Sequence, residues 1–489
     1  MLNPASQEPT SRMIFLLGFL WILVGLSVSS AQTKVFRAGA SISNITPPLG
    51  EGIVGNYGTP PPATHIHDQL NVRSLALDDG ETRLVFVLCD NVSINREVFD
   101  EAKRMVNEAT GLPVDKMLMA ATHTHSGISA GGKGKRRRGW HTDEPLDGYQ
   151  AFLAQRIADG VRIALNNLEP AKIGWGVGSV PQHVFNRRWK MKPGTPTINP
   201  FGKSDVAVMN PGVGNPNLLE PAGPTDPGVS FISVQSVAGK PIALLANYSL
   251  HYVGGLPDDA ISADYFGMFA DRIQELLKAD RQDPPFVGIL SNGTSGDVNN
   301  INFRGKPEKL PHYEKMRIVA NDVAAEVMRV HKTIKYQEWV PLKGAQSELT
   351  LAVRRPNAEE SQWAQAVLDR PDSAPVNHKL EKTYAQRTLQ MAEWPENITV
   401  ILQAFRIGEL GVATIPFETF TQTGLEIKAK SPFKPAFTIE LANGGYGYLP
   451  TPEQHELGGY ETWLSTNKVE KEASRKIVAE LLRLFEKLK

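Results

Sequence analysis

The stretch Lys116-Met-Leu-Met-Ala-Ala-Thr-His-Thr-His-Ser-Gly127 joins an apolar segment directly to two histidines. Its first part, 116–121, is predicted to be a short buried strand because apolar residues run through it without interruption. Upstream, Arg96–Thr110 has apolar residues at the spacing of one helix face, and Arg83–Leu88 is another apolar run. Strand, helix and strand in this order predict a βαβ unit with parallel strands, and therefore an α/β fold.

Further segments extend this α/β pattern along the chain into mixed sheets with flanking helices. Expected strands lie at about 36–45, 72–77, 231–236, 241–250, 286–290, 399–406 and 411–415. Expected helical regions lie near 148–168, 266–277, 358–394 and 469–488. Residues 192–227 are rich in Pro, Gly and Asn, which predicts a long loop. No strong linker interrupts the pattern, so 32–489 is expected to form one continuous domain.

The composition is that of a globular protein with no excess charge. The 489 residues include 52 Lys+Arg and 52 Asp+Glu, and 41% are apolar. Proteins that bind nucleic acid usually carry a basic excess, so this partner is not expected. Cys89 is the single cysteine, which excludes an internal disulfide and is typical of a small buried side chain.

The first residues have the pattern of a secretory signal peptide. Arg12 precedes the apolar run Met13–Leu26, and small residues stand at Ser29 and Ala31. We expect cleavage after Ala31, so 1–31 would be the signal peptide and the mature protein would be secreted or periplasmic. A membrane anchor is the alternative, but it needs about 20 apolar residues, and this run is shorter.

Polar side chains follow several of the predicted strands. His123 and His125 leave the strand 116–121, His251 leaves 241–250, and Asp90 leaves the strand before them. In α/β sheets, ligands bind beyond the carboxyl ends of strands, and neutral imidazole is a common metal ligand. A surface or core histidine pair would give the same H-x-H pattern. The repetition of such strand exits nevertheless favours one shared metal site.

A set of motifs, in order along most of the chain, resembles the N-terminal catalytic domain of the neutral/alkaline (non-lysosomal) ceramidases. The number and the order of these motifs carry the resemblance. They are Ala38–Thr46, His67, Ala121–Gly127, Asn186-Arg187, Gly239–Ile242, Gly296–Val298, Ile415–Glu418, Tyr448–Glu453 and Gly459–Glu461.

The resemblance implies a zinc ion held by two His, one Glu and one Tyr. The matching positions here are His123, His251, Glu418 and Tyr448. It also implies that His125 faces the substrate or lies behind the ligands. Arg187 and Tyr460 would contact the substrate carbonyl or its oxyanion. The amide of Asn299, which replaces a serine of the family, can form a hydrogen bond with a zinc-bound water or with the substrate carbonyl. Substrate binding would involve Asn186, Arg187 and Asp297.

Two departures from the family qualify these roles. Asn299 stands where the ceramidases carry a catalytic serine, which predicts attack by water without an acyl-enzyme. The ceramidases continue into a C-terminal β-sandwich, whereas this chain ends at Lys489 after one further expected helix. The basic segment Gly131–Arg138 is either a solvated loop or a clamp for an anionic substrate or lipid headgroup.

The sequence therefore predicts an exported zinc hydrolase that cleaves an amide, with N-acyl lipids as the leading substrate class by resemblance. Other amides and esters stay open, as does an inactive binding protein on the same scaffold. Hydrolysis of a phosphate or sulfate ester has support only from the basic segment. Iron or manganese would also suit these ligands. Oligomeric state and peripheral membrane contact are not determined at this level.

Overall fold

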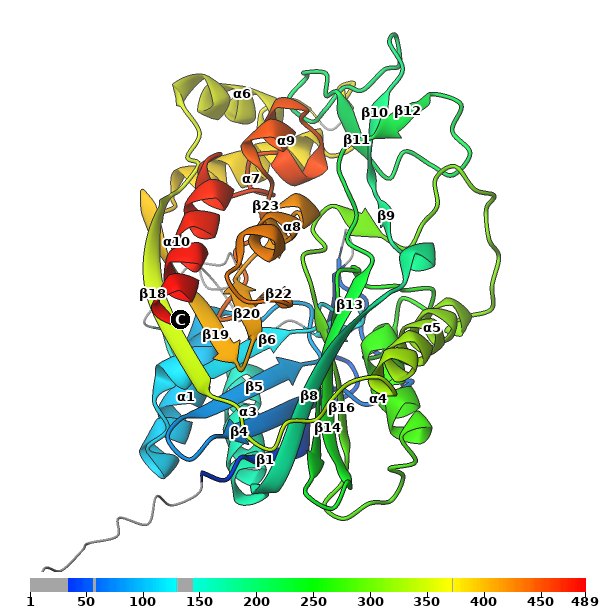
Figure 1. Cartoon of the computed structure of the whole chain (residues 1–489). Helices are drawn as coiled ribbons and strands as arrows, with labels where there is room; N and C mark the ends of the chain where they lie inside the picture. The colour runs from blue at the N-terminus through cyan, green and yellow to red at the C-terminus, as the bar shows by residue number, and fades with distance from the viewer. Residues whose placement is uncertain (1–33, 56–58, 129, 131–143, 372) are drawn as a thin grey trace, which may run out of the picture. The chain divides into compact units, whose positions relative to one another are not determined.

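An eight-stranded sheet forms the centre of the chain from Val35 onward (Figure 1). The computed structural model describes residues 34–55, 59–128, 130, 144–371 and 373–489. The strand order is β16 (Val287–Asn292), β14 (Pro241–Tyr248), β13 (Gly228–Ser236), β8 (Glu169–Ser179), β1 (Arg37–Asn44), β4 (Asn71–Asp78), β5 (Arg83–Cys89) and β6 (Met117–Ala121). The pairs β5–β6 and β14–β16 are parallel, and helix α1 (Arg96–Thr110) links β5 to β6. The predicted βαβ unit is thus confirmed.

A four-stranded sheet packs against one face of the large sheet. Its order is β18 (Leu342–Ala352), β19 (Asn397–Ile407), β20 (Leu410–Ile415) and β22 (Ala436–Glu440). Strands β19 and β20 correspond to the expected strands 399–406 and 411–415 and pair antiparallel, whereas β20 runs parallel to β22. One apolar cluster joins the sheets, with Phe86 and Leu118 on one side and Phe405 and Phe437 on the other.

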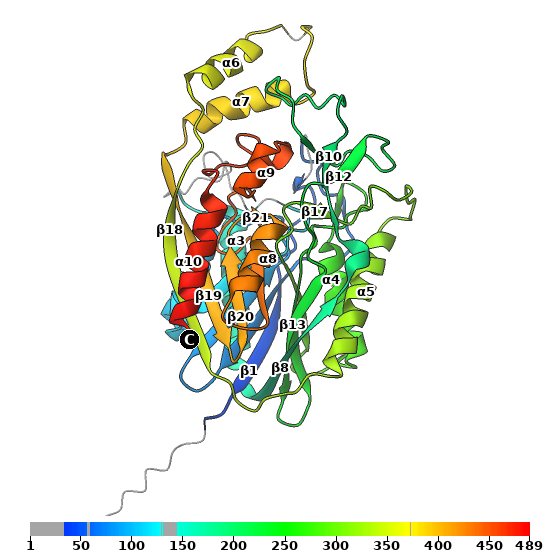
Figure 2. The same ribbon diagram turned by 45° about the horizontal axis from the view of Figure 1, so that its top comes forward.

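Helices cover the outer faces of both sheets (Figure 2). Helices α1 and α3 (Gly148–Asn166) pack on β4–β6, while α4 (Asp264–Leu276) and α5 (Glu314–His331) pack on β13, β14 and β16. Helices α8 (Thr421–Lys430) and α10 (Ala473–Lys487) cover the four-stranded sheet. The result is a helix–sheet–sheet–helix arrangement, which confirms the predicted mixed sheets with flanking helices.

Strand β5 shows why the apolar runs are continuous rather than alternating. Leu84, Phe86 and Leu88 enter the core between the sheets, whereas Val85, Val87 and Cys89 enter the core beneath α1 and α3. A strand that is buried on both faces needs apolar residues at every position. Cys89 is accordingly a free, buried thiol within this packing.

Several elements depart from the sequence prediction. The expected loop 192–227 contains β11 (Ala207–Met209) and β12 (Leu218–Pro221), which flank β10 (Arg188–Met191). The region 358–394 is two helices, α6 (Ala358–Leu368) and α7 (Glu381–Ala392). No element was predicted for β8, α5 or β18. Among the described residues, no helix has the length and apolar character needed to cross a membrane.

Short paired strands complete the structure and lie in the loops beyond the sheets. They are β2 (Ile53–Val54) with β7 (Gly127–Ile128), β3 (His65–Ile66) with β15 (Ala260–Ile261), β9 (Phe185–Asn186) with β17 (Val298–Asn299), and β21 (Glu418–Thr419) with β23 (Tyr448–Leu449). The short helix α9 (Pro452–Glu456) follows β23. These pairs matter because two of them, β9–β17 and β21–β23, carry residues predicted to form the site.

Candidate metal centre

Three imidazole rings converge at the carboxyl ends of β6 and β14. His123 and His125 follow β6, His251 follows β14, and one nitrogen of each lies within 4.8 Å of the others. The Nε2 atom of His123 is 3.0 Å from Nε2 of His251 and 3.1 Å from Nε2 of His125. His123 also has a positive φ of 78°, a conformation uncommon outside glycine and frequent at functional sites.

The backbone fixes which nitrogen of each ligand candidate carries hydrogen. The Nδ1 atom of His123 is 2.7 Å from the Val92 carbonyl oxygen, and Nδ1 of His251 is 3.1 Å from the Ser295 carbonyl oxygen. A carbonyl oxygen only accepts, so Nδ1 is the donor in both rings. When both rings are neutral, the Nε2 lone pairs therefore face each other, an arrangement that a bound cation would relieve.

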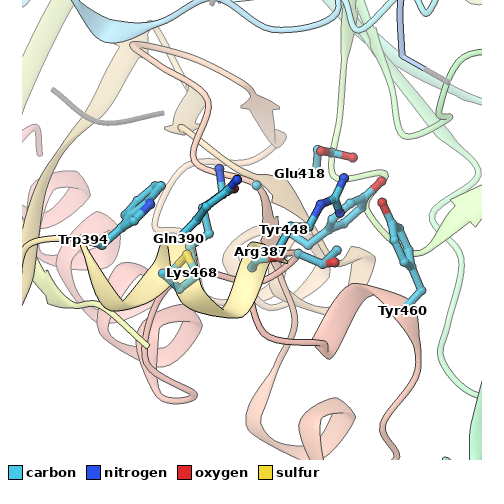
Figure 3. A pocket seen from close by; sticks show the side chains of 11 residues that line it. Arg387, Gln390, Trp394, Glu418, Tyr448, Tyr460 and Lys468 are labelled. Carbon is cyan, nitrogen blue, oxygen red and sulfur yellow. The ribbon is translucent and has the colours of Figure 1, made fainter. Parts of the chain in front are cut away.

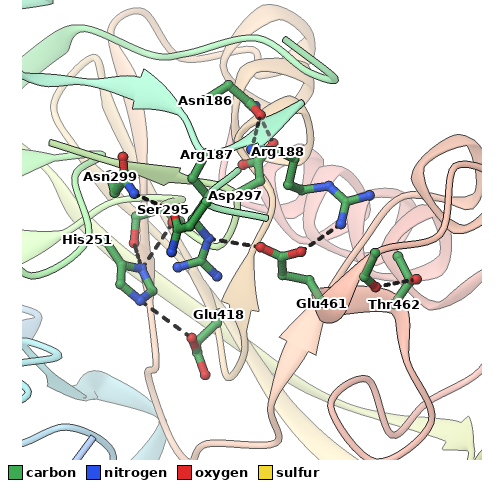
Figure 4. Close-up of polar contacts among 12 residues, drawn as sticks. Asn186, Arg187, Arg188, His251, Ser295, Asp297, Asn299, Glu418, Glu461 and Thr462 are labelled. Atoms are coloured by element: carbon green, nitrogen blue, oxygen red, sulfur yellow. Dashed lines mark hydrogen bonds and ion pairs between the residues drawn. The ribbon is translucent and has the colours of Figure 1, made fainter. Parts of the chain in front are cut away.

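Glu418 adds a carboxylate to this group (Figure 4). Its Oε2 atom is 3.4 Å from Nε2 of His123 and 3.8 Å from Nε2 of His251. Tetrahedral zinc, with bonds of about 2.0–2.1 Å, separates its ligand atoms by roughly 3.3 Å. Burial raises the pKa of Glu418, but His123, a hydrogen bond from Tyr448 and the charge of Arg187 together lower it. The residues present therefore fit a metal ion.

Tyr448 reaches the same place because β23 pairs in parallel with β21, with Tyr448 opposite Glu418. Its ring centroid is 5.3 Å from the guanidinium carbon of Arg187. Burial raises the pKa of the phenol well above its usual value, against the charge of Arg187, which lowers it. The structure thus gathers all four residues that the resemblance named as ligands from four separate segments.

His125 lies close enough to the other two imidazoles to contact the metal itself. Besides its 3.1 Å approach to His123, its ring stacks on Tyr252 with the centroids 3.7 Å apart. Burial lowers the pKa of His125 and of His251 well below the usual value, so both rings are neutral. Neutral imidazole is the form that binds a metal. A third imidazole is therefore available on the same face.

Arg187 lies beside the centre and is held by a buried carboxylate. Its Nε donates to Oε1 of Glu461 at 2.8 Å, and Nη1 of Arg188 donates to Oε2 of Glu461 at 2.6 Å (Figure 4). The Nη2 atom of Arg187 is buried and has no hydrogen-bond partner within the described part of the chain. A donor of this kind is available to a substrate oxygen.

Asn186, Asp297 and Asn299 brace the loop that carries Arg187. Asn186 Nδ2 donates to Asp297 Oδ2 at 3.0 Å, and the Arg187 N–H donates to the Asp297 carbonyl oxygen at 2.9 Å. The other oxygen of Asp297 accepts from Thr421 Oγ1 at 2.8 Å. Asn299 Nδ2 donates to a further asparagine, Asn210, at 2.9 Å. In this structure these side chains therefore form hydrogen bonds with other groups of the protein.

Asp90, whose strand exit suggested a place in the site, instead forms a buried ion pair. Its Oδ2 is 2.5 Å from Nη1 of Arg73 and accepts the backbone N–H of Asn71 at 2.9 Å. Burial raises the pKa of Asp90, and Arg73 opposes that rise. Asp90 therefore stabilises the ends of β4 and β5.

A pocket of about 550 Å³ opens beside the metal centre (Figure 3). Glu418, Tyr448 and Tyr460 line one end of it, and the ring centroids of the two tyrosines are 5.6 Å apart. The pocket extends to Trp394 at the other end. Its further lining residues are Arg387, Gln390, Met391, Gly447, Ser465, Thr466 and Lys468.

Sequence reasoning missed some of these residues. Glu440 ends β22 and accepts Ser295 Oγ at 2.6 Å and the Thr419 N–H at 2.7 Å, beside two predicted ligands. Its place at a strand end was the signal that could have found it. Arg387 and Lys468 carry no comparable signal, because only tertiary packing brings α7 and the segment before α10 to the same pocket.

Two solved structures have a similar fold. A crystal structure of neutral ceramidase from Pseudomonas aeruginosa matches with a TM-score of 0.63 and 17% identity, covering 93% of this chain and 75% of that one. A structure described as ceramidase complexed with C2 matches with a TM-score of 0.65 and 15% identity, at the same coverages. No family model matches the chain. The chain has a neutral ceramidase-like fold, as the sequence motifs predicted.

Proposed function

We propose that this chain is an exported zinc-dependent hydrolase that cleaves an amide bond, with N-acyl lipids as the leading class of substrate. The observation that carries this proposal is the convergence of three imidazole Nε2 atoms on one another, with Oε2 of Glu418 3.4 Å from His123. The likeness to two ceramidase structures supports the choice of an amide substrate.

His123, His251, Glu418 and Tyr448 would hold the zinc ion. Imidazole and carboxylate ligands with room for a further group are typical of catalytic rather than structural zinc. Zinc supplies Lewis acidity that activates water near neutral pH and polarises a carbonyl. His125, on the same face, would orient the incoming water or substrate through its Nε2 atom.

Arg187 and Tyr460 would bind the oxygen of the scissile carbonyl. Arg187 keeps its Nη2 atom without a partner in the described structure, while Glu461 fixes the orientation of the guanidinium. Donors placed in advance at the site of developing negative charge stabilise the transition state. Tyr460 lines the pocket next to Tyr448 and offers a second hydroxyl there.

Direct attack by water, without an acyl-enzyme, fits the side chains present. Asn299 occupies the place of the ceramidase serine, and its amide contacts Asn210. The hydroxyl of Ser295 donates to Glu440 at 2.6 Å and lies 3.3 Å from Nδ1 of His251, on the side of the ring away from Nε2. Trapping of an acyl group on Ser295 or Ser126 would contradict this mechanism.

Metal content is the primary test. Mass spectrometry of purified mature protein should find about one zinc per chain, and His251→Ala and Glu418→Ala should lose it. His312→Ala, at an exposed histidine, should retain it. Wild-type protein that binds no metal after incubation with zinc would refute the proposal. The metal-loaded protein is then assayed on N-acyl amides, with N-acylsphingosine among them.

An inactive binding protein on the same scaffold is the second candidate, and Asn299 in place of the serine favours it. Zinc-loaded wild type that binds N-acyl amides but releases no fatty acid from any of them would support this candidate. Export is tested separately by sequencing the N-terminus of the mature protein, expected to begin at Gln32. The signal peptide and the basic segment 131–138 lie outside the described residues.

A further inference from the structure

We propose that the pocket beside the metal centre binds an anionic group of the substrate, with Lys468 and Arg387 as the residues that recognise it. This inference rests on the proposed function and narrows it. The substrate would be an N-acyl compound that carries a carboxylate or a phosphate near the scissile amide. A neutral lipid such as an unmodified ceramide would fit less well.

Two cations from distant parts of the chain line this one pocket. Arg387 lies on α7, with its guanidinium carbon 5.2 Å from the ring centroid of Tyr384. Lys468 follows the turn after Leu464, with Nζ 5.1 Å from the ring centroid of Trp394. Figure 3 shows Arg387 in the middle of the pocket, between Trp394 and the end formed by Glu418 and Tyr460.

Neither cation is neutralised by a carboxylate in the part of the chain that the structure describes. No ion pair joins Arg387 or Lys468 to a described Asp or Glu, and both side chains are half-buried. Among the described residues that line the pocket, Glu418 is the only acidic one, and its Oε2 is directed toward His123 and His251. With a metal ion bound there, the pocket would retain an uncompensated positive charge.

Burial also makes the Lys468 charge costly in the absence of an anion. Burial, together with the charge of Arg387, lowers the pKa of Lys468 to about 8, although Glu418 acts in the opposite direction. An anion bound between the two cations would stabilise the charged form of the ammonium, because opposite charges attract strongly where water is scarce.

Ser465 supplies an independent observation at the same place. Its hydroxyl is buried, lines the pocket and has no hydrogen-bond partner among the described residues. Its φ is 76°, a strained conformation for a serine. Buried hydroxyls are normally paired, so this donor is explained by a ligand oxygen that completes the site.

The remaining lining residues favour a polar group over an alkyl chain. Gln390 and Thr466 add donors, whereas Met391 and Trp394 are the main apolar surfaces. A long alkyl chain would leave two cations without solvent or counter-charge, which is unfavourable. We therefore assign the acyl chain to another path and the anionic substituent to this pocket.

The test compares two substrate pairs that differ only in charge. The first pair is N-dodecanoylglycine and N-dodecanoylglycinamide, and the second is N-dodecanoylethanolamine phosphate and N-dodecanoylethanolamine. Zinc-loaded wild type should show kcat/KM at least about tenfold higher for the anionic member of one pair. The pair that responds identifies the group as a carboxylate or a phosphate. Equal or better turnover of the neutral member in both pairs would overturn the proposal.

Variants that remove one positive charge test whether the preference for anionic substrates arises in this pocket. Lys468→Met and Arg387→Gln should each reduce the anionic-to-neutral ratio of kcat/KM about tenfold, mainly through KM. The ratio is insensitive to partial loss of folded protein. Lys471→Met is the matched control, because its exposed ammonium pairs with Glu456 at 3.3 Å. A ratio that stays at the wild-type value in both pocket variants would refute the assignment.

Binding measurements separate this inference from the proposed catalysis. If no compound is hydrolysed, calorimetry gives the Kd of each pair member for the zinc-loaded protein. Tighter binding of the anionic member, lost in Lys468→Met, would support the subsite even though the hydrolase proposal had failed. Equal Kd values for both members of each pair would refute the subsite. Inorganic phosphate alone is a further probe. If phosphate competes with the anionic substrate for binding, both bind in the same pocket.

Discussion

Arg187 has one nitrogen held by Glu461 and another, Nη2, without a partner among the described residues. The guanidinium is planar, so a bond at Nε also sets the direction in which Nη2 points. The backbone adds a second constraint, because the Arg187 N–H donates to Asp297. A single side chain therefore combines a fixed orientation with an available donor.

Replacing Arg187 with lysine keeps the charge but removes this planar fork. A lysine cannot contact Glu461 and the substrate oxygen in the same directions, so Arg187→Lys should lower kcat about a hundredfold. Zinc content should stay at the wild-type value. Arg317→Lys, at an exposed residue paired with Glu314, is the control. Activity of Arg187→Lys within about threefold of wild type would rule out the oxyanion role.

Asp264 is a buried acid away from the metal that should affect stability. Its carboxylate accepts the N–H groups of Val253 and Gly254 at 3.1 and 2.8 Å, just after His251. Burial nevertheless raises its pKa from 3.8 to about 6. The folded protein therefore binds this proton at a higher pH than the unfolded chain does, and the contribution of Asp264 to stability increases as pH falls from about 6 to 4.

Asp264→Asn should remove this pH dependence. When the pH falls from 7 to 4.5, the difference in the free energy of unfolding between wild type and the variant should change by about 2 kcal/mol, in the direction that stabilises wild type. Urea unfolding in EDTA measures this difference without a contribution from metal release. Asp280→Asn, at an exposed position, should titrate like wild type. A constant difference between wild type and Asp264→Asn across this range would show that Asp264 is not protonated there.

At the scale of elements, the residues of the metal centre lie at the ends of strands. Strands β6 and β14 end just before His123 and His251, and β21 begins at Glu418. Glu440, the last residue of β22, supports two of these ends through hydrogen bonds to Ser295 and Thr419. Groups that orient metal ligands commonly tune affinity, so a strand that provides no ligand can still control the centre.

Glu440→Gln tests this support. Both carboxylate oxygens accept hydrogen bonds, and an amide NH2 in place of one of them would face the Asn292 or Thr419 donor. We expect zinc affinity, measured against a competing chelator, to fall about 10–100-fold with the fold retained. Glu338→Gln, at an exposed residue, should leave the affinity unchanged. Affinity within twofold of wild type in Glu440→Gln would argue against the role.

At the scale of the molecule from Val35 onward, the metal centre joins distant segments. His123 follows β6 at one edge of the eight-stranded sheet, and His251 follows β14, the strand next to the opposite edge. Glu418 and Tyr448 lie on β21 and β23, which are outside this sheet. A ligand that binds only the folded state stabilises it by about 4 kcal/mol at a thousandfold excess over Kd. Bound zinc should therefore stabilise the whole domain.

Thermal unfolding should respond to zinc accordingly. Removal of metal with EDTA should lower the wild-type Tm by roughly 5 °C or more, and added zinc should restore it. In His251→Ala the Tm should not change with either treatment, whereas His312→Ala should behave like wild type. A wild-type Tm that is the same with and without zinc would contradict a metal that connects these segments.

Local pattern was enough to predict much of this fold and the identity of the candidate ligands. The βαβ unit, the strands 399–406 and 411–415 and the histidines at strand ends follow from hydrophobic periodicity, which depends on neighbouring residues alone. The motif resemblance then named His123, His251, Glu418 and Tyr448. The resemblance to ceramidases is confirmed at the level of the fold.

Tertiary structure decided what periodicity does not carry. It placed His125 in the imidazole cluster and paired Arg187 with Glu461. It also paired Asp90 with Arg73, away from the metal centre, and formed strands within 192–227. It also placed Arg387 and Lys468 on one pocket. The contact of Arg187 with Glu461 and that of His123 with His251 join residues more than a hundred positions apart in the chain. Such contacts form only when whole elements pack, so they depend on tertiary structure and not on the local preferences that hydrophobic periodicity reports.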